Sequence, residues 1–350
     1  MTEHIDTRPI WQKIIQNYWF RTLLQNLITV IAAITFIFFL VRLMPGSPLD
    51  NYIDELINTE NLSYEEAYNQ AAALFDFDPN ANVVSQYFHY LAKVAQGDLG
   101  ESLISSGTKV TDQIARFLPW TIFSVGLALL ISFTIGILIG IVAAYFRNSW
   151  IDNFISIAAS ILDSVPDYIW GLLIILVFGV KLDWFDVGKM RGTYGTDVTP
   201  GFNLPFLLSA LYHSILPVIT YVIGTIGGWT LAMRGSTIST LGEDYVSIAR
   251  ARGLKKMRII TSYVGRNATL PLITLLALSI GLSMGGAVII ESLFVYKGIG
   301  SLLAGAISSR DYTQMQGILL IITIAVIFSN MLADMLYGLL DPRVKISGEK

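Results

Sequence analysis

Long apolar runs without a charged side chain dominate this chain. Five of them hold 20, 30, 36, 24 and 22 residues, and they lie between Arg21 and Arg42, Arg116 and Arg147, Asp197 and Arg234, Arg266 and Glu291, and Asp311 and Asp334. A helix needs about 20 mostly apolar residues to cross a bilayer, because every backbone amide has to be paired inside the lipid. Each run therefore predicts a membrane-spanning helix. The run of 36 residues also leaves room for a re-entrant approach before its span.

The stretch from Asn153 to Val180 is apolar in content but carries Asp163 and Asp167 around Pro166. Proline has no amide hydrogen to donate, so buried protein or water has to satisfy the groups that it frees in a helix. The pattern predicts a sixth span that is broken or kinked at this point. Carboxylates are costly at membrane depth, and we expect both aspartates to face protein or water.

Six spans place both ends of the chain on one side of the membrane, and the basic residues indicate which side. The segments on that side hold 14 Lys and Arg, and the opposite loops hold 9 in a much greater length of chain. Since Lys and Arg are enriched in cytoplasmic loops, both termini are predicted to be cytoplasmic. No small-residue cleavage signal follows the first run, so we expect residues 21–43 to be retained as span 1.

Residues 44–115 predict a small extracytoplasmic module. They hold 11 acidic and two basic residues, and 72 residues are more than a simple connection requires. Ser63-Tyr64-Glu65-Glu66 is a capping box that opens a helix, and apolar residues recur at helical spacing from Val84 to Val94. The alternative is that these residues form a long loop that binds no partner.

The first 20 residues predict a helix that lies in the cytoplasmic interface. One apolar stripe runs along it at helical spacing, formed by Trp11, Ile14, Ile15, Tyr18 and Trp19. Residues 341–350 are expected to form a cytoplasmic tail.

Composition narrows the function classes. Hydrophobic residues make up 53% of the chain and charged residues 14%, against about 25% charged in an average globular protein. Cysteine is absent, which excludes a disulfide framework and a thiolate metal site, and His4, His89 and His213 are too far apart in sequence to suggest a metal site. The net charge of −3 argues against nucleic-acid binding.

One motif resembles the nucleophile elbow of hydrolases, Gly281-Leu282-Ser283-Met284-Gly285. The elbow requires a strand-to-helix turn and a histidine partner, whereas this segment lies in a predicted membrane helix. We interpret three glycine pairs at i, i+4 spacing as helix contacts that let backbones approach: Gly136 with Gly140, Gly224 with Gly228, and Gly281 with Gly285.

The segment between spans 4 and 5 concentrates charged and small residues. Glu243 and Asp244 stand where a helix N-terminus favours anions, and a basic run from Lys255 to Arg258 follows near its C-terminal end. Small residues keep part of this helix thin at Ala249, Ala251 and Gly253. Such a helix suits a groove on another protein, and a solvated loop bound to anionic lipid is the alternative.

Glu243 to Pro271 resembles the coupling-helix, or EAA-type, motif of ABC importer permeases, in the longer spacing of the dipeptide/oligopeptide class. Other segments follow in the order of that family over nearly the whole chain, and the ordered set is specific although each segment alone is weak. They are Arg42-Leu43-Met44-Pro45-Gly46-Ser47-Pro48, Gly97-Asp98-Leu99-Gly100-Glu101-Ser102, Leu118-Pro119-Trp120-Thr121, Ser164-Val165-Pro166, Gly285-Gly286-Ala287, Asp311-Tyr312 and Asp341-Pro342-Arg343.

The resemblance implies an all-α integral membrane protein of the type I ABC importer permease fold, located in a prokaryotic inner or plasma membrane. Its core would comprise residues 116–340, with a cytoplasmic coupling segment at 238–267 and the extracytoplasmic insertion after span 1. The implied partners are a second homologous permease subunit, two ATP-binding subunits, an extracytoplasmic solute-binding protein and membrane lipid, with no nucleic acid.

The resemblance assigns five residues to docking on the ATPase: Glu243, Asp244, Ala249, Ala251 and Gly253, with Gly253 permitting the turn. The chain has no phosphate-binding G-x-x-x-x-G-K-[ST] loop, so ATP and Mg are expected on the partner subunits, with no cofactor bound by this chain. No catalytic residue and no metal site is expected. Asp163 and Asp167 are the candidates for lining the translocation path.

Peptide is the substrate that the resemblance favours. The chain departs from the residues usual in peptide permeases at three positions, Tyr263, Lys297 and Thr313. In these departures it resembles the branch of the class that includes oligosaccharide importers. Oligosaccharide import by the same machinery therefore stays open, and a stand-alone secondary transporter is the alternative from another class.

Overall fold

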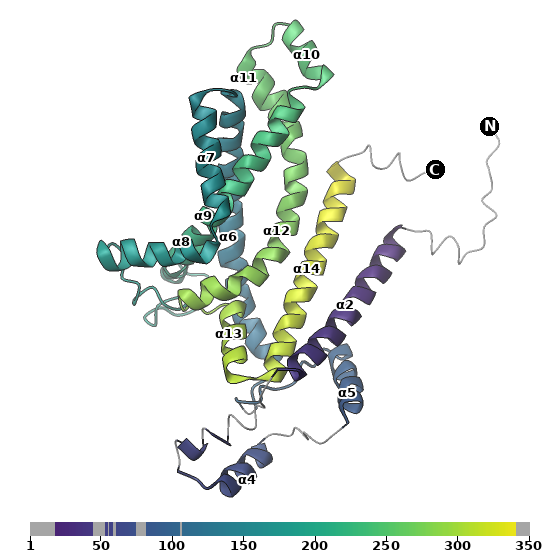
Figure 1. Ribbon diagram of the computed structural model, residues 1–350, viewed down its shortest axis with the longest axis vertical. Coiled ribbons are helices and arrows are strands. Elements are labelled where there is room, and N and C mark those ends of the chain that lie inside the picture. Colours follow the sequence, from purple (N-terminus) through teal and green to yellow (C-terminus); the bar gives the residue numbers. More distant parts are fainter. Residues whose placement is uncertain are drawn as a thin grey trace, which may run out of the picture. The chain divides into compact units, whose positions relative to one another are not determined.

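The computed structural model describes residues 18–44, 53–54, 56–58, 61–74, 82–105 and 107–340, which fold almost entirely into helices (Figure 1). The interfacial helix predicted for the first 20 residues falls outside these ranges except at its end, where helix α2 begins at Tyr18. The predicted tail at 341–350 also lies outside the described residues.

Five helices are long and apolar enough to cross a membrane, and a bent pair of helices makes a sixth if the pair is counted as one span. The five are α2 (Tyr18–Arg42), α6 (Val110–Tyr145), α9 (Leu204–Thr240), α12 (Arg266–Leu293) and α14 (Tyr312–Leu340). The bent pair consists of α7 (Trp150–Ser164) and α8 (Asp167–Ile174), which continues as the π-helix η1 (Ile175–Lys181). The predicted all-helical class is thereby confirmed for the described part of the chain, with five spans, or six when the bent pair is counted as one span.

The predicted break in the third span is confirmed at Pro166. Helix α7 ends at Ser164, Val165 is extended, and the axis turns by 94° before α8 begins at Asp167. A residue that precedes proline is pushed out of the helical region by the proline ring, which ends α7 at this point.

The predicted re-entrant approach before span 4 is wrong, because α9 is one continuous helix of 37 residues. Its start is fixed by Asn203, whose side-chain oxygen accepts a hydrogen bond from the amide of Phe206 at 2.9 Å. Pro205 falls in the first turn, where an amide would lack a partner in any case. Pro217 lies in the interior without ending the helix.

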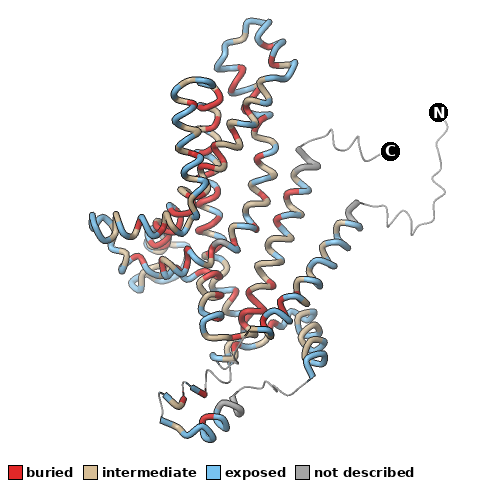
Figure 2. The backbone as a smooth tube through the Cα atoms, in the orientation of Figure 1, coloured by how far each residue is buried: buried red, intermediate tan, exposed pale blue. Residues whose placement is uncertain are grey.

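Two compact units divide the chain, one of residues 1–111 with 309–327 and the other of residues 112–308 with 328–350. In the second unit α9 is the central helix and packs against α7, α8 and α12. Its buried core joins Leu129 of α6, Leu216 of α9 and Ile290 of α12. Buried residues are drawn in red in Figure 2.

The three glycine pairs differ in what they contact. A Cβ at Gly140 of α6 would lie 2.6 Å from the Thr230 carbonyl of α9, so the predicted backbone approach is confirmed for the pair in α6. The pair in α9 also forms a helix contact, but Gly224 and Gly228 meet the side chains of Asp167 and Asp163 and not a backbone. At Gly285 no described atom lies within 4 Å of an added Cβ, so this glycine makes no such contact.

The first unit contains α2, α4 (Tyr64–Leu74), α5 (Val83–Ala95) and the beginning of α14. The predicted capping box is present, since the Ser63 hydroxyl and Glu66 carboxylate bond reciprocally across the first turn of α4. Helix α5 packs on α2 through aromatic rings, with Phe38 against Tyr87 at 5.2 Å between centroids.

Candidate functional site

Helix α10 (Asp244–Ala251) is a short helix between α9 and the next span, and its ends are set by backbone chemistry. Glu243 precedes it in an extended conformation. At the other end Gly253 has a φ of +73°, its amide donates to the Arg250 carbonyl at 2.9 Å, and the Leu254 amide donates to the Ala249 carbonyl at 3.3 Å. This is a Schellman motif, and its left-handed residue favours glycine.

One face of α10 is buried on the chain itself. Val246 and Ala249 have exposed fractions of 0% and 3%, and they pack against Ile259 and Val264 of the π-helix η2 (Ile259–Gly265). This small core holds α10 firmly on the segment that continues into α12.

Polar contacts strengthen the same connection. The Asn267 amide nitrogen of α12 donates to the Tyr245 hydroxyl of α10 at 2.9 Å. One residue further, the Ala268 carbonyl accepts a hydrogen bond from the Ser236 hydroxyl of α9 at 2.7 Å. The Asn267-Ala268 part of the sequence motif thus joins α9, α10 and α12.

Four of the five residues predicted to dock on a partner are exposed: Glu243, Asp244, Ala251 and Gly253. Ala249 is buried on the opposite face, where it packs against η2. Sequence reasoning missed Ile248, which is 57% exposed beside these residues. A large apolar side chain at the centre of a charged helix was the available signal for a contact surface.

Asp163 and Asp167, the two candidates for the translocation path, flank the bend between α7 and α8. Their side chains lie against Gly228 and Gly224, one turn apart on α9. Asp163 is exposed and Asp167 is half-buried. The two glycines leave the space that the carboxylates occupy, so the structure brings both candidates together on one side of α9.

A different aspartate has a structural role that the sequence did not reveal. Asp152 at the start of α7 is almost fully buried and accepts two hydrogen bonds from Arg234 of α9, at 2.5 and 2.8 Å. Paired bonds of this kind between guanidinium and carboxylate are strong and fix orientation. This ion pair holds α7 to α9 across 82 positions of sequence.

Glu291 near the end of α12 is fully buried and binds the start of α13 (Ile299–Ser309). Its carboxylate accepts hydrogen bonds from the amides of Gly300 and Ser301, at 2.8 and 3.0 Å, and from the Thr121 hydroxyl of α6. The Thr121 oxygen in turn accepts from the Ile299 amide at 2.8 Å. Glu291 therefore joins the end of α12 to the start of α13 and to α6.

In the residues that the structure covers, no three His, Cys, Asp or Glu side chains gather where they could hold a metal ion. The hydrolase-like motif lies inside α12, a membrane-spanning helix, and not on a strand-to-helix turn.

Comparison with known proteins identifies a family that this chain matches. Residues 136–346 match the family described as the binding-protein-dependent transport system inner membrane component. This range includes α10, the bend at Pro166 and Glu291 with its partners Gly300 and Ser301, whereas Thr121 precedes it.

Curated relatives match over most of their length. The di/tripeptide transport system permease protein of Pseudomonas aeruginosa is 34% identical over 88% of this chain and 92% of its own length. The oligopeptide transport system permease protein of Bacillus subtilis is 31% identical, covering 93% of this chain and 98% of the relative. The glutathione transport system permease protein of Pectobacterium atrosepticum is 30% identical, with 94% and 99% covered. The chain therefore belongs to the family of binding-protein-dependent transport system inner membrane components.

Proposed function

We propose that this chain is the permease subunit of an ATP-driven importer and forms half of the translocation pathway for peptides delivered by an extracytoplasmic solute-binding protein. The observation that carries this proposal is the near full-length match to permeases named for di/tripeptides, oligopeptides and glutathione, which is itself a tripeptide. The relatives lend no support to the oligosaccharide alternative or to a stand-alone secondary transporter.

Helix α10 is the proposed docking element for the ATPase, on the cytoplasmic side. Its exposed face presents Asp244, Ile248 and Ala251 to a partner, while Val246 and Ala249 hold it to η2. We place ATP and Mg on two partner subunits, because this chain has no phosphate-binding loop of the expected pattern. A second homologous permease would complete the pathway.

Asp163 and Asp167 are the proposed lining of that pathway. No ion-pair partner is found for either carboxylate among the described residues, in contrast to Asp152 with its arginine. A pair of carboxylates suits the ammonium group of a peptide. Uptake of a dipeptide should fall in the Asp163→Asn and Asp167→Asn variants, with unchanged expression and ATPase copurification; unaltered uptake in both variants would remove them from the pathway.

The acidic region at 44–115 is the proposed contact for the solute-binding protein. In its described part, α4 exposes Glu65, Glu66 and the stacked rings of Tyr64 and Tyr68. We place this region on the extracytoplasmic side.

The experiment that tests the function is uptake into proteoliposomes that contain both permeases, both ATPases and the binding protein. We expect ATP-dependent accumulation of labelled di- and tripeptides and none of an oligosaccharide of similar mass. Accumulation driven by an ion gradient without ATP would contradict the proposal.

Gly253 offers the sharpest test of docking. No described atom lies within 4 Å of a Cβ built at Gly253, so a side chain there meets nothing within the chain itself. We expect Gly253→Arg to leave membrane insertion intact and to abolish both transport and copurification of the ATPases. Gly253→Ala carries the same left-handed strain, about 1–2 kcal/mol, without the bulk, and should keep part of the activity.

If the Ala and Arg variants behave alike, backbone strain is the cause of the defect and the docking assignment fails. If Gly253→Arg transports normally, α10 does not bind the ATPase.

A further inference from the structure

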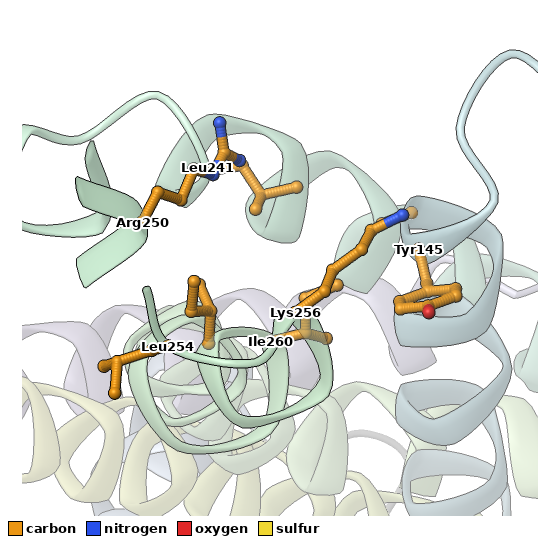
Figure 3. A pocket seen from close by; sticks show the side chains of 8 residues that line it. Tyr145, Leu241, Arg250, Leu254, Lys256 and Ile260 are labelled. Carbon is orange, nitrogen blue, oxygen red and sulfur yellow. The ribbon is translucent and has the colours of Figure 1, made fainter. Parts of the chain in front are cut away.

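A cavity of about 380 Å³ lies beside α10, and it has an apolar floor and a cationic rim. Ile259 and Ile260 of the floor are buried, whereas Arg250 and Lys256 at the rim are exposed. Figure 3 shows the Lys256 chain extended toward Tyr145 and the Arg250 side chain on the far side of the opening.

The cavity lies at the level where the apolar helices end. Tyr145 is the last residue of α6, and Leu241 directly follows the last residue of α9. Lys256 is the first residue of the apolar helical segment Lys256–Gly285, which contains η2 and most of α12. Lipid headgroups occupy this level in a bilayer, and the acyl chains lie just beneath it.

The chemistry of the lining selects a particular kind of ligand. Two cations on opposite sides of an opening favour an anion between them, and the Lys256 ammonium is held in place over the Tyr145 ring at 4.2 Å from its centre. No described acidic side chain is among the lining residues. The leucine and isoleucine floor favours an apolar tail attached to that anion.

We propose that this cavity binds an anionic phospholipid, with its phosphate between Arg250 and Lys256 and its glycerol and upper acyl chain on Leu254 and Ile260. Basic pockets at the ends of membrane helices are suited to such headgroups. The bound lipid joins α10 to the end of α6. The site uses residues other than those proposed to dock on the ATPase, so it stands whether or not that docking occurs.

The test is lipid binding to the full-length chain, purified in detergent and titrated with phosphatidylglycerol or with phosphatidylcholine of the same acyl chains. Native mass spectrometry counts the lipids bound. We expect the first phosphatidylglycerol to bind about tenfold more tightly than phosphatidylcholine, since each basic residue near a headgroup contributes to the attraction.

Matched variants separate the cavity from the general positive charge of the segment. Arg250→Gln with Lys256→Gln should abolish the preference for phosphatidylglycerol. Arg252→Gln with Lys255→Gln removes the same charge from exposed neighbours that do not line the cavity, and should change the preference by less than about twofold. Equal effects of the two double variants would overturn the proposal.

Two further measurements complete the test. Leu254→Trp fills the cavity with both cations intact and should also abolish the preference; an unchanged preference would contradict binding in the cavity. Inorganic phosphate is expected not to displace the lipid. If phosphate alone displaces it, the site recognises free phosphate and the lipid assignment is wrong.

Discussion

Two glutamates of this protein stabilise the start of a helix with the same chemistry in different surroundings. Glu66 accepts the Ser63 amide and hydroxyl at the start of α4, at 3.1 and 2.7 Å. Glu291 accepts two amides at the start of α13 and the hydroxyl of Thr121. Glu66 is exposed, whereas Glu291 has an exposed fraction of 0%.

The difference lies in what replaces the carboxylate when it is removed. Water can satisfy the donors around Glu66, so this contact orders one helical turn and little else. The donors around Glu291 are buried. A buried donor without an acceptor lowers the stability of the fold by the full free energy of its desolvation. Similar geometry therefore serves a local role at α4 and a global role at the junction of α6, α12 and α13.

Removal of Glu291 is expected to have the largest effect. Glu291→Ala leaves the Thr121 hydroxyl and the Gly300 and Ser301 amides without their acceptor, and we expect the free energy of unfolding to fall by about 3 kcal/mol or more. Thermal unfolding of the purified chain in detergent measures it. Glu291→Gln keeps one acceptor oxygen and should lose less than half as much; a normal melting temperature for the alanine variant would show that the cluster contributes nothing.

A methyl group beside the buried carboxylate should have the next largest effect. A Cβ at Gly298 would overlap the Glu291 carboxylate, so Gly298→Ala should destabilise the chain by about 1–3 kcal/mol. Gly126→Ala in α6 is the control, since no described atom lies within 4 Å of a Cβ built at Gly126. The control should stabilise the chain by about 0.5–1 kcal/mol, because alanine favours a helix more than glycine does. Similar shifts in both variants would contradict the crowding at Glu291.

The smallest effect is expected at α4. Glu66→Ala should speed amide hydrogen exchange in α4 and leave the melting temperature of the chain unchanged. Glu65→Ala removes a charge from the same turn but no bond to Ser63, and should alter exchange less. A lower melting temperature for Glu66→Ala would show that α4 is coupled to the rest of the fold.

Acidification sharpens this comparison. The hydrogen bonds from the Ser63 hydroxyl and amide lower the pKa of Glu66. The stabilisation of α4 is therefore complete above the ordinary glutamate pKa of about 4.3 and is lost as the pH falls through the lower folded value. Exchange in α4, corrected for the intrinsic rate, should accelerate over that range in the wild-type chain and not in Glu66→Ala.

The contacts of Glu66 and Glu291 also show which features the sequence could predict. Ser63 and Glu66 are three positions apart and form a local pattern, so the capping box was visible without a structure. Thr121 and Glu291 are 170 positions apart, and Asp152 and Arg234 are 82 apart. Such pairs depend on helix packing, which no local pattern specifies.

The spans and the break at Pro166 followed from hydropathy and from the chemistry of proline. The re-entrant approach was wrongly predicted because a run of 36 apolar residues fits one long helix as well as two segments, and the Asn203 cap decides between them. Within the proposed docking site, the turn at Gly253 was predicted, whereas the buried position of Ala249 depends on η2, a π-helix that the sequence did not indicate.

The seating of α10 has a mechanical consequence. Val246 and Ala249 fix this helix to η2, and Tyr245 is bonded to Asn267 in α12. The helix therefore has little freedom to tilt alone, and we expect a force on its exposed face to be transmitted to α12.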